Sequence, residues 1–243
     1  MRREKFASYT DSQFTDALNE IYEYLVKNKN PAAIPKAILL GGQPGAGKTT
    51  LHKIIGQREP NTVFIVGDDF REHHPNFAAL NEKYGDSVPY TAPFAGKMTE
   101  AIIERLSDER YNLMIEGTLR TTEVPEKTNA LLKSKGYTTE LYVMAVSAEQ
   151  SWQGTIKRFE QMKMLGMTAR ATDKVHHDMV VAALPENLGK LYEGGFFERL
   201  RLYTREKLCI YDSEKTPGVN PRDLIKAVLE EKSKTALPRD AKQ

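Results

Sequence analysis

Short apolar runs alternate along the chain with longer stretches in which apolar residues recur every three or four positions. The short runs are typical of buried strands and cover 37–40, 62–66, 112–115, 141–146 and 209–211. The longer stretches predict helices at about 48–57, 94–110, 124–135, 148–164, 173–184 and 221–232. Strands that alternate with helices indicate a mainly parallel, twisted sheet covered by helices on both faces. The expected fold class is therefore α/β.

The two ends of the chain are predicted to differ from this alternating region. Apolar residues at helical spacing, with Thr10 or Asp11 able to cap the start, predict an amphipathic N-terminal helix over 11–28. The stretch from about 233 onward is polar and is predicted to fray. A length of 243 residues suits one domain that spans 1–243 and buries a substantial core.

Composition and charge narrow the classes of protein that the chain can belong to. Apolar residues make up 40% and charged residues 28%, as in ordinary globular proteins. The net charge of +2 gives no broad field for nucleic acid or an anionic membrane, so we expect neither as a partner. We also expect no secretion signal and no membrane span, because no apolar run approaches about 18 residues. The single cysteine, Cys209, is predicted to lie in a buried strand, and a reducing cytoplasmic location fits it.

A glycine-rich segment between the first predicted strand and the next helix matches the pattern G-x-x-x-x-G-K-[ST]. Such a loop turns backbone N–H groups toward phosphate oxygens at the positive end of a helix dipole. We therefore expect ATP, with Lys48 on the β- and γ-phosphates and the Thr49 hydroxyl on Mg²⁺. The residues expected to bind the nucleotide are Gly42, Gln43, Pro44, Gly45, Ala46, Gly47, Lys48, Thr49 and Thr50. The guanine-reading N-K-x-D of GTPases is absent from the sequence.

Acidic residues follow the second and third predicted strands. Asp68 and Asp69 come after the second strand, where a carboxylate can accept the proton of an attacking hydroxyl. A helix N-cap or an acid in the outer shell of Mg²⁺ is the alternative role, and Asp69 suits it as well as catalysis. Glu116 ends the third strand, where metal or metal-bound water is its natural partner and a surface acid is the alternative.

One threonine and three arginines are candidates for binding anionic groups. Thr118 and Arg120 follow the third strand and could hold an anionic or hydroxylated acceptor. Arg158 lies in a predicted helix and Arg170 in a looser segment after Gly166, as a lid over a transferring phosphate requires. A solvated charged face is the alternative for both arginines.

Two pairs of adjacent histidines, His73-His74 and His176-His177, superficially suggest a metal site. Neighbouring side chains diverge on a helix or strand, and the sequence offers no suitably spaced cysteine or third histidine. We assign these residues packing or surface roles.

Several motifs in order resemble one known family. They are L-L-G-G-Q-P-G-A-G-K-T-T, G-D-D-F-R-x-x-H-P, M-T-E-A-I-I-E-R-L, Y-N-L-M-I-E-G-T-L-R-T-T-x-V-P and M-T-A-R-A-T. Together they resemble the zeta toxins of epsilon/zeta (PezA/PezT-type) toxin-antitoxin systems, across about Tyr9 to Asp212. The resemblance implies a P-loop kinase that phosphorylates the 3′-hydroxyl of the amino sugar in UDP-N-acetylglucosamine and so blocks cell-wall precursor synthesis.

The resemblance also implies roles for individual residues and a protein partner. Asp68 resembles the general base, Arg158 and Arg170 resemble the pair that clamps the transferring phosphate, and Lys48 and Thr49 hold ATP and Mg²⁺. Five other residues resemble the family's contacts with the UDP-sugar: Glu100, Glu116, Thr118, Arg120 and Thr128. The implied partner is a small epsilon- or PezA-like antitoxin that covers the nucleotide site, in a heterotetramer.

Three alternatives remain open at this point. Asp69 directly follows Asp68, where many family members have a polar, non-acidic residue, so either carboxylate could take the proton. Related UDP-amino sugars could be accepted, because one epimeric hydroxyl is a small distinguishing feature. The chain could instead be another small-molecule P-loop kinase, such as an antibiotic or nucleoside phosphotransferase, or a non-catalytic nucleotide-dependent module.

Overall fold

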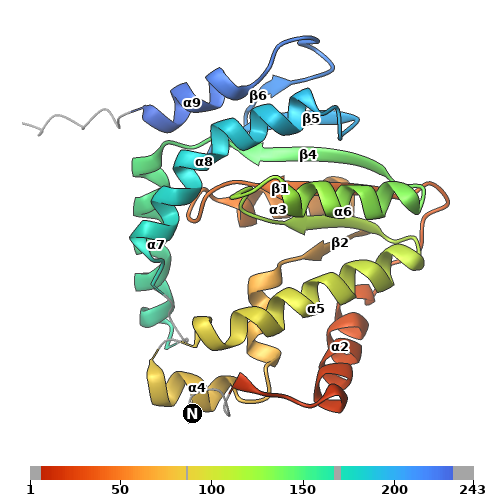
Figure 1. Ribbon diagram of the computed structural model, residues 1–243, viewed down its shortest axis with the longest axis vertical. Helices are drawn as coiled ribbons and strands as arrows, with labels where there is room; N and C mark the ends of the chain where they lie inside the picture. Colours follow the sequence, from red (N-terminus) through yellow and green to blue (C-terminus); the bar gives the residue numbers. More distant parts are fainter. Residues whose placement is uncertain (1–6, 86, 167–170, 232–243) are drawn as a thin grey trace, which may run out of the picture.

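The computed structural model describes residues 7–85, 87–166 and 171–231, in which six strands form one sheet of order β2-β3-β1-β4-β5-β6 (Figure 1). The strands are β1 (Lys36–Gly41), β2 (Thr62–Ile65), β3 (Asn112–Glu116), β4 (Thr138–Met144), β5 (Arg199–Tyr203) and β6 (Cys209–Asp212). The first five pair in parallel, and β6 alone is antiparallel. The predicted α/β class with a mainly parallel sheet is confirmed.

Helices precede, connect and follow the strands of this sheet. They are α2 (Asp11–Val26), α3 (Lys48–Arg58), the 3-10 helix η1 (Gly67–His73), α4 (Phe77–Tyr84), α5 (Val88–Asp108), α6 (Glu123–Ser134), α7 (Ala148–Met164), α8 (Lys174–Glu193) and α9 (Arg222–Glu230). The predicted cap of the first helix is Thr10, which forms a capping box with Gln13. None of the helices in the described ranges is both long enough and apolar enough to span a membrane.

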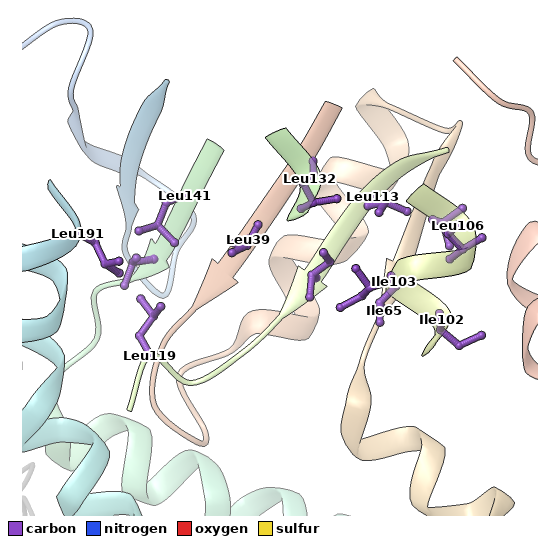
Figure 2. Packing of buried hydrophobic residues seen from close by; sticks show 14 of the residues in the cluster. Leu39, Ile65, Ile102, Ile103, Leu106, Leu113, Leu119, Leu132, Leu141 and Leu191 are labelled. Carbon is purple, nitrogen blue, oxygen red and sulfur yellow. The ribbon is translucent and has the colours of Figure 1, made fainter. Parts of the chain in front are cut away.

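Side chains alternate between the two faces of the strands and fill two separate cores. On β1, Ala37 and Leu39 join the larger core, whereas Ile38 and Leu40 join the smaller one. The larger core packs under α2, α5, α6, α8 and α9, and the smaller one packs under α3. Figure 2 shows Leu39, Leu113 and Leu141 from three neighbouring strands on the larger core's side of the sheet. Burial of both faces explains why these strands have continuous apolar runs.

Two helices are longer than their sequence pattern predicts. The helix predicted from residue 94 begins at Val88, with Pro89 in its first turn and Pro93 inside it. The helix predicted to end at residue 184 continues to Glu193 and contains Pro185. Proline at a helix start replaces an N–H group that has no helical partner, so Pro89 is compatible with the earlier start. The helices η1 and α4 were not predicted.

The two C-terminal strands differ from the sequence prediction: β5 was not expected, and Cys209 in β6 is not buried. Strand β5, with the sequence RLRLY, alternates polar and apolar residues and contains no continuous apolar run to reveal it. The strand predicted at 209–211 exists, but the prediction that Cys209 is buried in it is wrong, because this side chain is exposed. The physical reason is position: β6 is the sheet edge and pairs only with β5.

Candidate active site

The carboxyl ends of the five parallel strands bring five separate segments to one edge of the sheet. Residues 42–47 follow β1, η1 follows β2, and residues 117–122 follow β3. Residues 145–147 follow β4, and the turn 204–208 follows β5. Ligands of open α/β sheets bind at this edge. All three acids singled out in the sequence, Asp68, Asp69 and Glu116, lie in these segments or at the strand end itself.

The phosphate-binding loop has the backbone that its glycines permit. Gly42, Gly45 and Gly47 have φ angles of 139°, 76° and 90°, which non-glycine residues rarely adopt. At Gly45 a Cβ atom would lie 2.0 Å from the carbonyl oxygen of Ser151. Glycine is therefore needed there for two reasons, a positive φ and the close approach of α7.

A buried side chain of the phosphate-binding loop fixes the loop to the segment that follows β4. The Gln43 side chain is fully buried, and its Nε2 donates to the carbonyl oxygen of Val146 at 2.6 Å. This side chain therefore points into the protein, so only its backbone remains for the nucleotide binding predicted from sequence. Thr49 and Thr50, at the start of α3, are exposed. A fixed loop with outward-facing threonines is pre-organised for an anionic ligand.

Lys48 and Glu116 lie close together, because Lys48 begins the helix after β1 and Glu116 ends the neighbouring strand β3. Lys48 Nζ donates to the Gly42 carbonyl oxygen at 2.8 Å and lies 3.7 Å from Glu116 Oε1. On the other side, His52 Nε2 lies 3.4 Å from Glu116 Oε2. Burial keeps the pKa of His52 below its ordinary value, so the imidazole is neutral at pH 7. Glu116 is thus held between one cation and one neutral ring, with its carboxylate beside the loop.

Asp68 lies at the start of η1, with its side chain 61% exposed and an Arg71 Nη2 atom 2.7 Å from its Oδ1. The two residues are three apart, which is one turn of a 3-10 helix, so their side chains lie on the same side. Gly67 precedes them, and a Cβ atom there would meet Thr99 Oγ1 of α5 at 2.6 Å. This close contact places the start of η1 against α5 at Thr99, the residue before Glu100.

The loop after β3 is held by a residue that the sequence motifs did not reveal. Leu119 has a φ angle of 57°, is buried, and occupies the space where a Cβ atom of Gly41 would lie, at 2.2 Å. Asn187 Nδ2 of α8 donates to the carbonyl oxygens of Leu119 and Arg120, at 2.9 and 2.8 Å. Figure 2 shows Leu119 beyond the end of β3, at the margin of the larger core. The exposed Arg120 and the half-buried Thr118 are therefore carried on a braced loop.

Two further residues implied by the family resemblance lie close together in the structure. Glu100 of α5 is 3.5 Å from Lys127 Nζ of α6, and Thr128 is the next residue along that helix. Both charged side chains are more than 70% exposed, so their ion pair contributes little stability. The contact nevertheless shows that Glu100 and the start of α6 are neighbours.

Arg158 lies on the face of α7 that meets the phosphate-binding loop. Ser151 and Thr155 of the same helix touch Gly45, and Arg158 is one turn further on. Its side chain is exposed, and Nη2 donates to Thr172 Oγ1 at 3.4 Å. Arg170 falls outside the described residues.

A chain of Ser151, His177 and Asp178 resembles a hydrolase triad in its distances. Ser151 Oγ is 2.9 Å from His177 Nε2, and His177 Nδ1 is 3.0 Å from Asp178 Oδ1. Ser151 and His177 are completely buried, so no substrate can reach the hydroxyl. We assign this chain the role of joining α7 to α8 beneath the loop. The other buried histidine, His74, packs edge-on against Phe94.

A strand, a glycine-rich loop of this geometry and a helix, set in a mostly parallel sheet, define a P-loop kinase-like fold. The sequence model of the family described as Zeta toxin matches residues 22–216. The chain belongs to the zeta toxin family.

Relatives and solved structures agree with this assignment. The chain is 48% identical over 224 residues to toxin PezT of Streptococcus pneumoniae, covering 91% of this chain and 88% of that protein. It is 46% identical over 228 residues to toxin zeta of Streptococcus pyogenes, covering 93% of this chain and 79% of the relative. A structure from the PezAT chromosomal toxin-antitoxin system of S. pneumoniae matches with a TM-score of 0.85 and 41% identity, covering 94% of this chain and 92% of its own.

Proposed function

We propose that this protein is the toxin of a toxin-antitoxin system and acts as an ATP- and Mg²⁺-dependent kinase. Its proposed acceptor is the 3′-hydroxyl of the amino sugar in UDP-N-acetylglucosamine. The observation that carries the kinase proposal is the fixed phosphate-binding loop, with Lys48 and Glu116 beside it and Asp68 on the segment after β2. Membership of the zeta toxin family supports the toxin role, and the choice of acceptor rests on the sequence motifs that resemble this family.

The residues at the loop fit the proposed nucleotide and metal. At Gly45 the loop approaches α7 through backbone atoms alone. The positive φ angles of its glycines suit a loop that turns N–H groups toward phosphate. Within the described ranges, no three His, Cys, Asp or Glu side chains form a cation cluster. Mg²⁺ does not need one, since it is usually bound by one or two protein oxygens together with phosphates and water. The Thr49 hydroxyl, with Glu116 through water, would provide those protein oxygens. Bound Mg²⁺ would offset charge on the phosphates.

In the proposed reaction, the sugar oxygen forms a bond to the γ-phosphorus while the bond from that phosphorus to the bridging oxygen breaks, releasing ADP. Asp68 accepts the proton of the sugar hydroxyl. Lys48 exchanges its contacts with the loop carbonyls for phosphate oxygens, and Arg158 stabilises the transferring charge together with Arg170. Arg71 holds the Asp68 carboxylate in place.

The proposed acceptor site lies between α5, α6 and the loop after β3. Glu100 and Thr128 come from the neighbouring helices, whereas Thr118 and Arg120 come from the loop that Asn187 braces. Arginine suits a diphosphate, because its planar fork can donate two parallel hydrogen bonds. The Glu100 carboxylate can accept hydrogen bonds from hydroxyl groups of the uridine or the sugar, and the threonine hydroxyls can donate or accept them.

The identity of the product tests this proposal. The purified chain, incubated with Mg²⁺, ATP and a panel of UDP-sugars, nucleosides and aminoglycosides, should add one phosphate to UDP-N-acetylglucosamine, at the 3′-oxygen. Mass spectrometry and phosphorus NMR identify the product and the modified hydroxyl. UDP-glucose, which lacks the acetamido group, is the matched control. Phosphorylation of a nucleoside or an aminoglycoside with none on the UDP-amino sugar would replace the proposal with another small-molecule kinase.

The second part of the proposal is a small antitoxin that covers the nucleotide site in a heterotetramer. The chain should arrest bacterial growth when expressed alone, and co-expression with a small epsilon- or PezA-like antitoxin should restore growth. The purified complex should bind ATP at least about 100-fold more weakly than the free chain, since a covering protein and the nucleotide exclude each other. Light scattering gives the mass of the complex. A complex that binds ATP as tightly as the free chain would refute coverage of the site.

A further inference from the structure

The turn between β5 and β6 lies against the phosphate-binding loop, although no motif in the sequence connects the two. Arg205 Nη1 donates to the carbonyl oxygens of Gly45 and Gln150, at 3.2 and 3.0 Å. Gly154 of α7 leaves room for this guanidinium, because a Cβ atom there would lie 3.0 Å from Arg205 Nη2. The turn is thus fixed to the loop by a specific contact.

Lys207 follows on the same turn and brings its ammonium group close to Gly47 of the loop. A Cβ atom built on Gly47, the residue before Lys48, would lie 3.6 Å from Lys207 Nζ. The ammonium donates to the carbonyl oxygen of Arg205, and Lys207 itself has a φ angle of 68°. This backbone conformation is unusual for lysine.

The protein only partly offsets the charge at this position, because Glu206 acts on both cations electrostatically without forming an ion pair with either. Within the part of the chain that the structure describes, no carboxylate forms an ion pair with Arg205 or Lys207. Both side chains are half-buried. Burial, and then the nearby Arg205, keep the pKa of Lys207 below its ordinary value. Two partly desolvated cations beside each other are unfavourable unless an anion offsets them.

We propose that Lys207 is a nucleotide-binding residue whose ammonium group contacts the phosphate chain of the bound nucleoside triphosphate beside Gly47. This inference rests on the proposed ATP binding and adds a residue far from the loop in sequence. Arg205 has a positioning role, because it fixes the turn to Gly45. The nucleotide thereby adds to the negative charge that Glu206 alone provides for the two cations.

Calorimetric titration of ATP into the full chain with Mg²⁺ tests the proposal. A charge-assisted hydrogen bond contributes about 1.5–3 kcal/mol, so Lys207→Asn should weaken ATP binding roughly 10- to 100-fold. Asparagine is chosen because it tolerates a positive φ. Lys207→Arg should stay within about threefold of the wild type, since arginine retains the charge. Lys215→Asn, which removes an exposed lysine after β6, is the matched control and should bind ATP as the wild type does.

The outcomes separate this inference from the proposed function. If the unaltered chain fails to bind ATP, the nucleotide proposal itself is wrong. If it binds ATP and Lys207→Asn binds equally well, only the role of Lys207 is refuted. Equal losses in Lys207→Asn and Lys207→Arg would also overturn the proposal, because they would point to packing of the turn. A thermal melt of each variant confirms that the compared proteins are folded.

Discussion

Lys48→Ala is expected to reduce the rate of phosphoryl transfer by about a thousandfold, the largest loss we expect from one substitution outside the general base. Lys48 is buried within the loop and donates to the Gly42 carbonyl oxygen, which keeps its ammonium group directed along the cradle. Charge that develops on the transferring phosphate loses its closest fixed cation in the variant. Removal of one such donor typically costs about 10²–10³ in kcat. Lys48 also touches the ground-state nucleotide in the proposed site, so ATP binding should weaken too.

The measurement is the initial rate of ADP release with saturating UDP-N-acetylglucosamine, followed as the ATP concentration is varied. Lys53→Ala is the matched control, because Lys53 is an exposed lysine one turn further along α3 and should leave the rate unchanged. In cells, Lys48→Ala should abolish growth arrest while the protein accumulates at normal levels. Activity within tenfold of the wild type, in a folded variant, would be incompatible with the role assigned to Lys48.

The strand, loop and helix that carry Lys48 could be predicted from the sequence because every signal there is local. The apolar run before Gly42, the glycines and the lysine occupy adjacent positions, and the structure places them as strand, loop and helix start. The gathering of Glu116 and η1 at the same edge follows from parallel strand order, which alternating strands and helices also predict.

The residues that brace the site could not be predicted, because their partners are far away in sequence. Asn187 is 67 positions from Arg120, and Arg205 is 160 positions from Gly45. Neither an asparagine inside an amphipathic helix nor an arginine in a turn differs locally from a solvated surface residue. Strand β5 was missed for a related reason, since its arginines lie on one face and its leucines on the other. Alternation of this kind is typical of a half-buried strand, whereas the other parallel strands have continuous apolar runs.

The two adjacent aspartates can be separated by their geometry on η1. Successive side chains on a 3-10 helix point about 120° apart, so Asp68 and Asp69 cannot both face the same phosphate. Arg71 lies one turn after Asp68 and holds its carboxylate at 2.7 Å. A carboxylate fixed in this way can keep one oxygen on arginine and present the other to a hydroxyl. This arrangement favours Asp68 as the general base.

Asp68→Asn is therefore expected to lower kcat about 10²- to 10⁴-fold, the range that a positioned general base contributes. The Michaelis constant for ATP should change little, because asparagine keeps the size of the side chain and has no role in holding the nucleotide. Asp69→Asn is the matched control and should retain kcat within about threefold. Steady-state rates of product formation, measured for both variants and the wild type by mass spectrometry, provide the comparison.

The reverse pattern, a large loss in Asp69→Asn and a small one in Asp68→Asn, would assign the proton transfer to Asp69. It would also require η1 to turn when the acceptor binds, because Arg71 is paired with the carboxylate of Asp68. Arg71→Ala distinguishes the two cases. If Asp68 is the base, loss of the guanidinium should reduce kcat, since the carboxylate is no longer oriented. If Asp69 is the base, kcat should be unaffected or should rise, because the segment is freed to turn.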